Sequence, residues 1–325
     1  MLETFEQARL VEVSCDACGG TAKREQYPLR RGSIVQCPGC GFSFVSPRVE
    51  SAWLQARLQH WAERDVVDAE RLRISFEPGA LALYGRHLAR LEQLNGGTGR
   101  LLDVGCATGA LLSVARERGW QTHGLELGQA SSAYAQSLGL QVARGSLYDA
   151  PAPEQPYDAI AFMEVIEHLE SPHDALKRLA SWLKPGGLLL LSTPNYASLY
   201  RRLFGARWWV VNCEDEHIAF FTPKTLEAAL RAAGFKTEHI TIRGLDAVGM
   251  LRQWRRPTEQ AAGDAGYEAA RGSKEGFKAK LRRIGLLDAV RASLRALEWL
   301  MSLRGSPLFG LGEQIVIIAR RSDKA

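Results

Sequence analysis

The sequence predicts an α/β fold, a doubly wound and mostly parallel sheet of seven strands with helices on both faces. Three observations support this expectation. From residue 100 onward, short apolar runs of strand length alternate with amphipathic segments of helix length, which is the pattern of βαβ units. The first of these runs ends in a glycine-rich turn. Four of the 6 cysteines lie within the first 40 residues, so a small module of different character precedes the sheet.

The expected strands follow one another along the chain. They cover residues 100–104, 121–126, 141–144, 159–163, 188–192, 235–243 and 314–319. Helices are expected after the first glycine turn up to residue 118, at 129–138 and at 172–183, and the last of these leads into a Lys-Pro-Gly-Gly loop at 184–187. Before the sheet, one amphipathic helix is indicated by the spacing of Leu81, Leu83, Leu88, Leu91 and Leu94. The glycine-rich loop at 95–99 ends it.

These elements divide the chain into five segments. Residues 1–49 form the cysteine module, 50–98 a helical linker or lid, and 99–244 the core. Residues 245–311 form a helical insertion before the last strand, and 312–325 hold that strand and a tail. A chain of 325 residues exceeds one typical domain, which agrees with a core that carries additional modules.

Composition excludes several protein classes. An apolar fraction of 46% allows a sizeable core and rules out disorder for most of the chain. No stretch approaches 18 consecutive apolar residues, so no transmembrane helix is expected. The N-terminal sequence MLETFEQARLVEV lacks the apolar run of a signal peptide, and we therefore expect a cytoplasmic protein.

The net charge of +5 is unevenly distributed, because residues 251–310 hold 12 Lys or Arg against 6 Asp or Glu. An anionic partner would bind at that segment.

The clustered cysteines have the spacing of a structural zinc site. Cys15 and Cys18 form one C-x-x-C pair, and Cys37 and Cys40 form a second pair 18 residues later. Four thiolates complete a tetrahedral shell and leave no open position for chemistry. The alternative of two disulfides is disfavoured in a cytoplasmic protein. Residues 1–49 are therefore expected to form a zinc ribbon that depends on the metal for much of its stability.

The glycine turn after the first strand points to a nucleoside ligand. Asp103 is the last residue but one of that strand. Gly105 and Gly109 follow with three residues between them, which is not the G-x-G-x-x-G spacing of a dinucleotide site. Glycines at this place let a ligand approach the backbone at the switch point of an open α/β sheet. Glu126 ends the second strand, where a carboxylate can accept hydrogen bonds from both hydroxyls of a ribose.

The core motifs resemble those of the class I S-adenosylmethionine-dependent methyltransferases, which have a Rossmann-like sheet. The resemblance covers about half of the chain. Its motifs are Asp103–Gly109, Glu126, Tyr157–Ile160 with Glu164–His168, and Leu183–Gly187. The later segments Asp215–Pro223 and Ala233–Phe235 resemble the UbiG-like branch. The cysteine module followed by Gly41–Arg48 also resembles the N-terminus of methyltransferases of sugar and polysaccharide pathways.

The resemblance implies roles for individual residues. The turn containing Gly105, Ala107 and Gly109 would pass under the methionine part of S-adenosylmethionine, and Asp103 would orient it. Glu126 would hold the ribose. Ser146 and Leu147 would edge the adenine, and Met163 would line the cavity after the fourth strand. Ala107 replaces the middle glycine of the family pattern, which we expect to be a mild change. Ser146 stands where many relatives have an acid, so adenine recognition departs from the pattern.

Methyl transfer needs a positioned nucleophile and, for an oxygen acceptor of high pKa, a general base. The candidates are His217, which follows a stretch rich in Tyr, Trp and Arg, His168 at the start of the helix after the fourth strand, and Glu164 just before it. Two interpretations stay open for the aromatic residues of that stretch. They either form walls for a sugar ring or planar acceptor or cover the end of the sheet. These residues are Tyr196, Tyr200, Trp208 and Trp209.

The insertion also allows two interpretations. Residues 284–303 form a helix with a broad apolar face and a narrow polar stripe, which suits burial against the core or a partner. Alternatively the helix lies on the inner membrane surface, helped by four preceding cations, and binds there peripherally to reach a lipid-linked acceptor. These cations are Lys278, Lys280, Arg282 and Arg283.

The sequence is compatible with three functions. The first is O-methylation of a small-molecule, sugar or lipid-linked glycan acceptor, with a histidine base. The second is methylation of RNA, bound through the ribbon and the basic insertion, although the ribbon has few basic residues and no aromatic stacking ladder is evident. The third is a protein that binds the cofactor without turnover. Oligomeric state does not follow from the sequence.

Overall fold

The structure is a computed structural model, and it describes residues 7–212, 216–244, 293, 296–297, 299–304, 306 and 309–322. Asp215 and most of the expected insertion at 245–311 lie outside the described residues, as do the side chains of Trp209 and Asn212.

The central sheet has the predicted seven strands. They are β6 (Arg100–Val104), β7 (Gln121–Glu126), β8 (Gln141–Arg144), β9 (Tyr157–Met163), β10 (Leu183–Pro194), β12 (Phe235–Arg243) and β13 (Gln314–Arg321). The strand order is β12-β13-β10-β9-β6-β7-β8. Only β13 runs antiparallel to its neighbours in this sheet, and the other pairs are parallel. The predicted Rossmann-like, doubly wound and mostly parallel α/β sheet is confirmed.

One predicted loop is wrong. The Lys-Pro-Gly-Gly segment at 184–187 lies inside β10, which begins at Leu183 instead of Leu188. The pairing of β10 with β9 is irregular there, because the register shifts between Leu183 and Leu188. Gly186 has φ 75°, a conformation that glycine adopts readily. An irregularity of this kind allows the strand to continue through residues that otherwise favour a turn.

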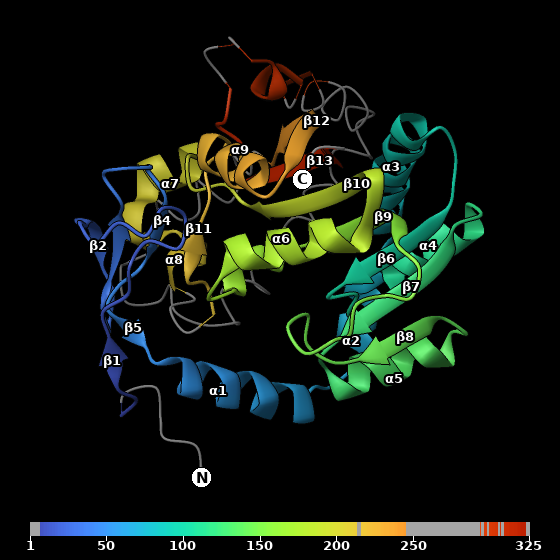
Figure 1. The fold of residues 1–325 in the computed structure, drawn as a ribbon, viewed down its shortest axis with the longest axis horizontal. Coiled ribbons are helices and arrows are strands. Elements are labelled where there is room, and N and C mark those ends of the chain that lie inside the picture. Colours follow the sequence, from blue (N-terminus) through green and yellow to red (C-terminus); the bar gives the residue numbers. More distant parts are fainter. Residues whose placement is uncertain are drawn as a thin grey trace, which may run out of the picture.

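Helices cover both faces of the sheet (Figure 1). On one face lie α3 (Pro78–Asn95), α4 (Ala110–Glu117) and α5 (Gln129–Ser137), and on the other lie α6 (Pro172–Trp182) and α9 (Pro223–Ala232). The side chains of alternate β10 residues pack on opposite faces of the sheet, as expected for a strand buried on both sides. Leu188 and Leu190 pack with Leu88 of α3, whereas Leu189 and Leu191 pack with Leu176 of α6.

The N-terminal segment builds a small antiparallel sheet that residues from the core complete. Its strands are β2 (Arg24–Pro28), β3 (Ser33–Gln36) and β4 (Ser43–Val45), in the order β11-β4-β3-β2, and β11 (Ala219–Phe220) comes from far along the chain. Two further short strands, β1 (Leu10–Val11) and β5 (Arg48–Val49), pair with each other. We call residues 7–49 the ribbon.

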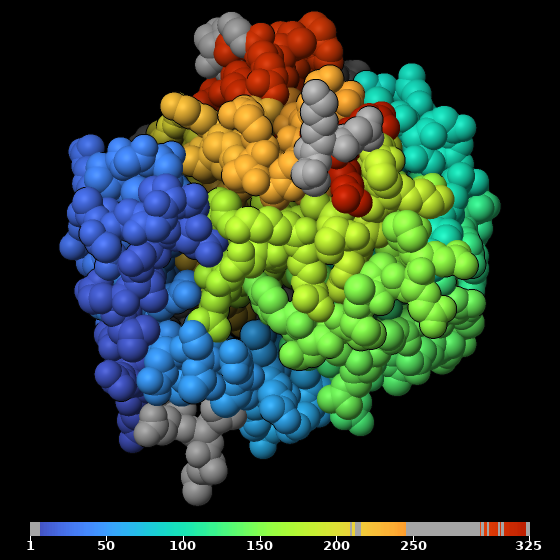
Figure 2. Space-filling view, viewed as in Figure 1, coloured from blue at the N-terminus to red at the C-terminus, as the bar shows by residue number. Residues whose placement is uncertain are grey.

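Two helices follow the ribbon. The first, α1 (Ser51–Glu63), leads from the ribbon toward α5 at the opposite end of the molecule (Figure 1). Figure 2 shows the ribbon and α1 in blue beside the yellow-green surface of α6. The second, α2 (Ala69–Ser75), has Asp68 as its N-cap, since the side chain of Asp68 accepts a hydrogen bond from Arg71 N.

The stretch between β10 and β11 is largely helical. It contains α7 (Leu199–Phe204), η2 (Gly205–Arg207) and α8 (Trp209–Asn212), and η1 (Ile166–His168) lies directly after β9. Tyr196, Tyr200 and Trp208 are buried in one apolar cluster with Ile34 and Val45 of the ribbon. These three aromatic side chains therefore pack as core between the ribbon and the sheet, which favours the second interpretation, that they cover the end of the sheet.

The described part of the insertion packs on the core. Met301 is fully buried, and Leu297 and Phe309 contact the same apolar cluster as α9. Ser302 Oγ accepts a hydrogen bond of 2.8 Å from Ile242 N. Trp299 is 62% exposed, so the opposite side of this short segment faces solvent. Within the described residues, no helix is long and apolar enough to span a membrane.

A pair of glycine substitutions tests the packing of the sheet. A methyl group added at Gly124 of β7 would lie 2.7 Å from Cys106 Sγ and 2.9 Å from Leu112 Cδ1, so Gly124→Ala should destabilise the protein by about 1–3 kcal/mol. Gly85→Ala in α3 meets nothing within 4 Å and should stabilise it by about 0.5–1 kcal/mol. Urea unfolding measures both. Equal effects of the two substitutions would contradict the packing of β7 described here.

Candidate active site

The carboxyl ends of β6, β7 and β9 meet at one edge of the sheet, and the glycine turn lies between β6 and α4. Gly105, Ala107 and Gly109 have φ values of 77°, 46° and 80°. A side chain at Gly105 would clash with Val165, because its Cβ would lie 2.6 Å from Val165 Cγ2. Ala107 is not glycine, and its left-handed φ of 46° costs a non-glycine residue roughly 1–2 kcal/mol. The alanine is therefore not the mild change that the sequence suggests.

Glu126 binds this turn with both carboxylate oxygens. Oε2 accepts a hydrogen bond of 2.8 Å from Ala107 N, and Oε1 accepts one of 2.7 Å from Gly128 N. Glu126 is only 5% exposed. Burial raises the pKa of Glu126, and the two backbone hydrogen bonds partly offset that rise. The carboxylate is thus held at the end of β7 by the backbone on either side of it.

Asp103 is buried at the end of the neighbouring strand. Burial, reinforced by the charge of Glu126, raises the pKa of Asp103 to about 7. Ionisation of this carboxyl group near neutral pH would make the turn a place of concentrated negative charge, which favours a cationic ligand.

A cavity of about 270 Å³ lies over the turn. Five of the residues predicted from the sequence line it, namely Asp103, Gly105, Ala107, Met163 and Glu164. Other walls come from residues that sequence reasoning missed, which include Ser75, Tyr84, His87, Ser192, Arg243 and Gln314. Gly109, Glu126, Ser146 and Leu147 are not among the lining residues. The structure therefore brings the turn and the end of β9 together in one cavity.

Glu164 has a strained backbone and a fixed side chain. Its φ of 54° is left-handed, and among the described residues only Ala107 shares this feature without being glycine. Glu164 Oε1 accepts hydrogen bonds from Ser192 Oγ at 2.6 Å and Gln314 Nε2 at 2.8 Å. Burial raises the pKa of Glu164. Strain of this kind is often found at functional sites, and both strained residues line the same cavity.

The histidine candidates lie together, but they are not among the residues that line this cavity. The rings of His168 and His217 have centroids 4.8 Å apart. Their potential ligand atoms and those of Glu167 all lie within 4.8 Å of one another. Thr193, whose neighbour Ser192 binds Glu164 on the cavity side, donates a hydrogen bond of 3.0 Å to Glu167. The alternation of β10 thus separates the Glu164 side of the site from the Glu167–His168–His217 cluster.

Burial lowers the pKa of both histidines of this cluster. Burial lowers the pKa of His217 to about 4, with a further contribution from His168, so its imidazole is neutral at neutral pH. Nδ1 of His217 lies 3.0 Å from Val210 O, and Nδ1 of His168 lies 3.0 Å from Glu216 O. A carbonyl only accepts, so each Nδ1 carries the proton and Nε2 is the basic nitrogen. Burial also raises the pKa of Glu167 well above its usual value, with a further contribution from Glu164.

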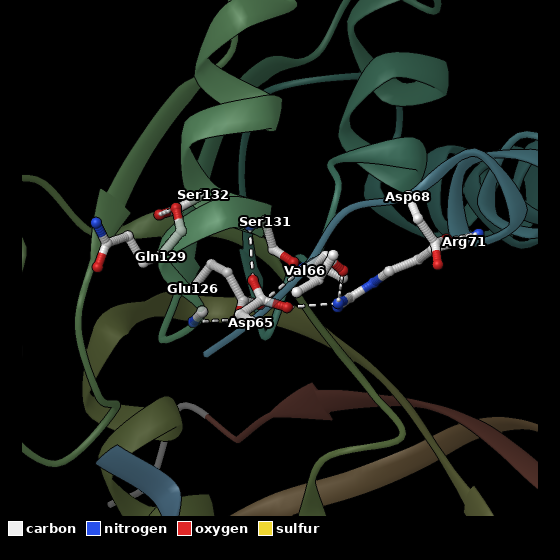
Figure 3. Close-up of polar contacts among 10 residues, drawn as sticks. Asp65, Val66, Asp68, Arg71, Glu126, Gln129, Ser131 and Ser132 are labelled. Atoms are coloured by element: carbon white, nitrogen blue, oxygen red, sulfur yellow. Dashed lines mark hydrogen bonds and ion pairs between the residues drawn. The ribbon is translucent and has the colours of Figure 1, made fainter. Parts of the chain in front are cut away.

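A residue of the linker reaches the same edge of the sheet as Glu126 (Figure 3). Asp65, between α1 and α2, has a fully buried side chain that forms an ion pair with Arg71. Its other oxygen, Oδ2, accepts a hydrogen bond of 2.7 Å from Ser131 N in the first turn of α5. The hydrogen bonds from Ser131 and Arg71 overcome the effect of burial and lower the pKa of Asp65. Asp65 lies in a helix break with no recognisable motif, so no signal in the sequence identifies it.

Ser146 and Leu147 lie in the turn that follows β8. Leu147 is buried in the core. Ser146 Oγ accepts a hydrogen bond of 3.1 Å from Tyr148 N, and its carbonyl accepts one of 3.0 Å from Ala150 N. Ser146 therefore stabilises the turn itself, and its proximity to an adenine ring stays a prediction.

The Sγ atoms of the four ribbon cysteines all lie within 4.8 Å of one another, close enough to bind one metal ion. Cys15 Sγ lies 3.5 Å from Cys40 Sγ, and Cys18 Sγ lies 3.6 Å from Cys37 Sγ. These separations exceed a disulfide bond of about 2.05 Å and fit the spacing of about 3.8 Å between sulfurs bound to zinc at about 2.3 Å. A side chain at Gly20 would lie 3.3 Å from Cys18 Sγ, so the knuckle backbone approaches the sulfurs closely.

The metal assignment has a direct test. Purified protein should contain one zinc ion per chain by elemental analysis, and Cys37→Ser should lose it, since a site of three thiolates is incomplete. Loss of the metal should make residues 7–49 sensitive to proteolysis. It should leave the central sheet folded, because the apolar cluster on the α3–α4 face of the sheet contains no ribbon residue. Cys106→Ser is the matched control. Protein prepared without chelators that contains no zinc would contradict the zinc-ribbon assignment.

Comparisons with known proteins agree with this geometry. Residues 75–240 match the family model of a methyltransferase domain. The ubiquinone biosynthesis O-methyltransferase of Idiomarina loihiensis is 32% identical over 158 residues, 45% of this chain and 64% of that protein. The one from Leptothrix cholodnii is 30% identical over 168 residues, 48% of this chain and 71% of that protein. The match thus spans about two thirds of the length of these relatives.

Solved structures include an S-adenosylmethionine-dependent methyltransferase from Archaeoglobus fulgidus, with a TM-score of 0.48 at 20% identity over 78% of this chain and 100% of that chain. The family model alone covers half of this chain, and its matched residues contain the turn, Glu126 and Glu164. The chain belongs to the class I S-adenosylmethionine-dependent methyltransferases, with UbiG-like O-methyltransferases among its relatives.

Proposed function

We propose that the protein transfers the methyl group of S-adenosylmethionine to an oxygen atom of a small-molecule or glycan acceptor. The observation that carries the cofactor part is the pair of hydrogen bonds that hold the Glu126 carboxylate between Ala107 N and Gly128 N. The two relatives from Idiomarina loihiensis and Leptothrix cholodnii are O-methyltransferases of ubiquinone biosynthesis, which supports oxygen as the acceptor atom.

The residues present fit this cofactor. The turn of Gly105, Ala107 and Gly109 would lie under its methionine part, and Glu126 has remaining lone pairs for the ribose hydroxyls. The cavity wall carries the carboxyl groups of Asp103 and Glu164, which suit a cationic group. Ser146 and Leu147 would edge the adenine, and Met163 would line the methionine side. When bound, the cofactor supplies a methyl group already activated on a sulfonium.

We assign the general base to the His168–His217 pair. A base must be unprotonated before it accepts the acceptor's proton, and His217 is neutral at neutral pH. The hydrogen bond from its Nδ1 to Val210 O orients the ring and leaves Nε2 as the accepting atom. Glu164 is the second candidate, since it lines the cavity and burial raises its pKa toward the working range.

Glu126→Gln tests the cofactor site. The substitution keeps the size of the side chain and removes its charge, so S-adenosylmethionine should lose charge-assisted hydrogen bonds of about 1.5–3 kcal/mol, which is about 10- to 150-fold in Kd. Calorimetric titration measures the affinity, with NAD as the control ligand and Glu154→Gln, an exposed acid, as the control variant. Unchanged affinity would remove Glu126 from the ribose site.

His217→Gln tests the base. It should lower kcat by about 10²- to 10⁴-fold and leave the Kd of S-adenosylmethionine unchanged, with His60→Gln on the exposed face of α1 as control. Because protonation inactivates a base and the pKa of His217 is about 4, wild-type kcat should hold from neutral pH down to about pH 5 and fall only as the pH passes through about 4. His217→Gln should abolish that decline.

A different pattern of activities would contradict the assignment of His217 as the general base. Full activity of His217→Gln, combined with loss of activity in Glu164→Gln, would move the base to the cavity. The rate of the wild type would then fall at a higher pH than 4, because burial raises the pKa of Glu164 above 4.5.

A further inference from the structure

The ribbon contacts the part of the molecule that holds His168 and His217. We propose that the ribbon is a positioning element of the active site, and that Asp16, between two zinc-binding cysteines, is its positioning residue. This inference rests on the proposed function insofar as His168 and His217 act in catalysis. It assigns to the four-cysteine module a role in placing the base, beyond its own structural stability.

The first link is a strand that the ribbon shares with the histidine segment. Phe44 and Ser43 of β4 pair with Ala219 and Phe220 of β11. Val45 N donates a hydrogen bond of 3.0 Å to Ile218 O.

Ile218 joins this strand to the other side of the cluster. Ile218 N donates a hydrogen bond of 3.0 Å to Glu167 O. Its peptide groups are therefore held between the ribbon and the loop after β9. His217 is the residue directly before Ile218, and His168 is the residue directly after Glu167. The distance between the two rings thus depends on a backbone bridge that β4 completes.

The second link caps α6. Asp16 Oδ2 accepts hydrogen bonds from His173 N at 3.0 Å and from His173 Nδ1 at 2.5 Å. The N-cap Ser171 makes no side-chain cap hydrogen bond, and Pro172 is the first residue of the helix and has no N–H. Asp16 therefore satisfies the first free backbone N–H of α6 and places a negative charge at its positive end.

The position of Asp16 explains why the metal matters to α6. Asp16 directly follows Cys15 and precedes Cys18 by two residues, so the first knuckle determines where its carboxylate lies. The loop that carries Glu167 and His168 runs straight into α6. Close to the same point, Arg48 of β5 forms an ion pair of 3.5 Å with Glu170. The ribbon thus fixes the end of the loop as well as the strand opposite it.

The third link is apolar. Phe42 lies between the knuckles and the core, with its ring centroid 5.0 Å from that of Phe221 and 5.7 Å from that of His173. Cys15 and Cys37 belong to the same buried cluster as the sheet residues of the α6 face. The metal site and this half of the enzyme therefore share one hydrophobic core, and displacement of the knuckles must disturb it.

These links predict that damage to the ribbon affects kcat and cofactor affinity differently. Proton transfer depends steeply on the placement of the base, so that a displacement near 1 Å costs about 10²-fold in rate. Glu126 and the glycine turn are held instead by hydrogen bonds among β7, the turn and α5. Damage to the ribbon should therefore lower kcat and spare cofactor affinity.

The experiment compares Asp16→Ala, Asp16→Asn and the control Glu25→Ala in the full chain, before and after zinc removal. Glu25 is exposed on β2, at the opposite edge of the ribbon sheet from β11. Hydrogen exchange of the amides of Val45, Ile218 and Leu190 is followed by NMR, alongside kcat, the Kd of S-adenosylmethionine and the zinc content.

We expect Asp16→Ala to retain zinc, to lose about 10- to 100-fold in kcat and to keep its Kd within about twofold. The Val45 and Ile218 amides should exchange faster, whereas the Leu190 amide should not change. Asp16→Asn, which can still accept from His173 N, should recover part of kcat. Zinc removal should accelerate exchange at Val45 and Ile218 further, and Glu25→Ala should behave as wild type.

Two results would overturn the proposal. Native exchange at Ile218 in both Asp16→Ala and the zinc-free protein would show that the ribbon does not hold the histidine segment. Loss of kcat with unchanged exchange would mean that the ribbon acts by another route, such as direct contact with the acceptor. If even the wild type transfers no methyl group, the proposed function fails by itself, and the exchange data still decide whether the ribbon positions His217.

Discussion

The parallel alignment of the strands is the constraint on which the site depends. Because β6, β7, β9 and β10 run in the same direction, their carboxyl ends must meet at one edge of the sheet. Asp103, Glu126 and Glu164 end or follow three of these strands, so carboxyl groups far apart in sequence are concentrated at one place. Antiparallel pairing of any one of these strands with its neighbours would send its acid to the opposite edge.

The two-residue repeat of a strand then divides this edge into two halves. Ser192 binds Glu164 in the wall of the cavity, and its neighbour Thr193 binds Glu167 on the other face. The first half contains the glycine turn, and the second contains the two histidines and adjoins the ribbon. In the function proposed above, the methyl donor and the base are thus supported by different layers of the molecule. The position of one can therefore be disturbed without the other.

Features that depend on local sequence could be predicted, and features that depend on distant contacts could not. Periodicity and glycine placement identified the seven strands, and C-x-x-C spacing identified the cysteine site, since each signal lies within a few residues. The capping of α5 by Asp65 and of α6 by Asp16 joins residues 66 and 157 positions apart, and neither acid has a motif. The left-handed backbone of Ala107 also escaped prediction, because side-chain identity does not show a φ angle that the surrounding fold imposes.

The same contacts show which wall of the cavity is rigid. Strained backbones such as those of Ala107 and Glu164 persist where the surrounding contacts hold them. Ala107 N donates to Glu126, and Ser192 and Gln314 donate to the Glu164 carboxylate. Ser75 of α2 also lines the cavity, and α2 has no buried residue. Polar contacts of the buried Asp65 side chain with Arg71 and Ser131 link that segment to α5. The cavity is therefore preorganised on its sheet side, where hydrogen bonds hold both strained residues.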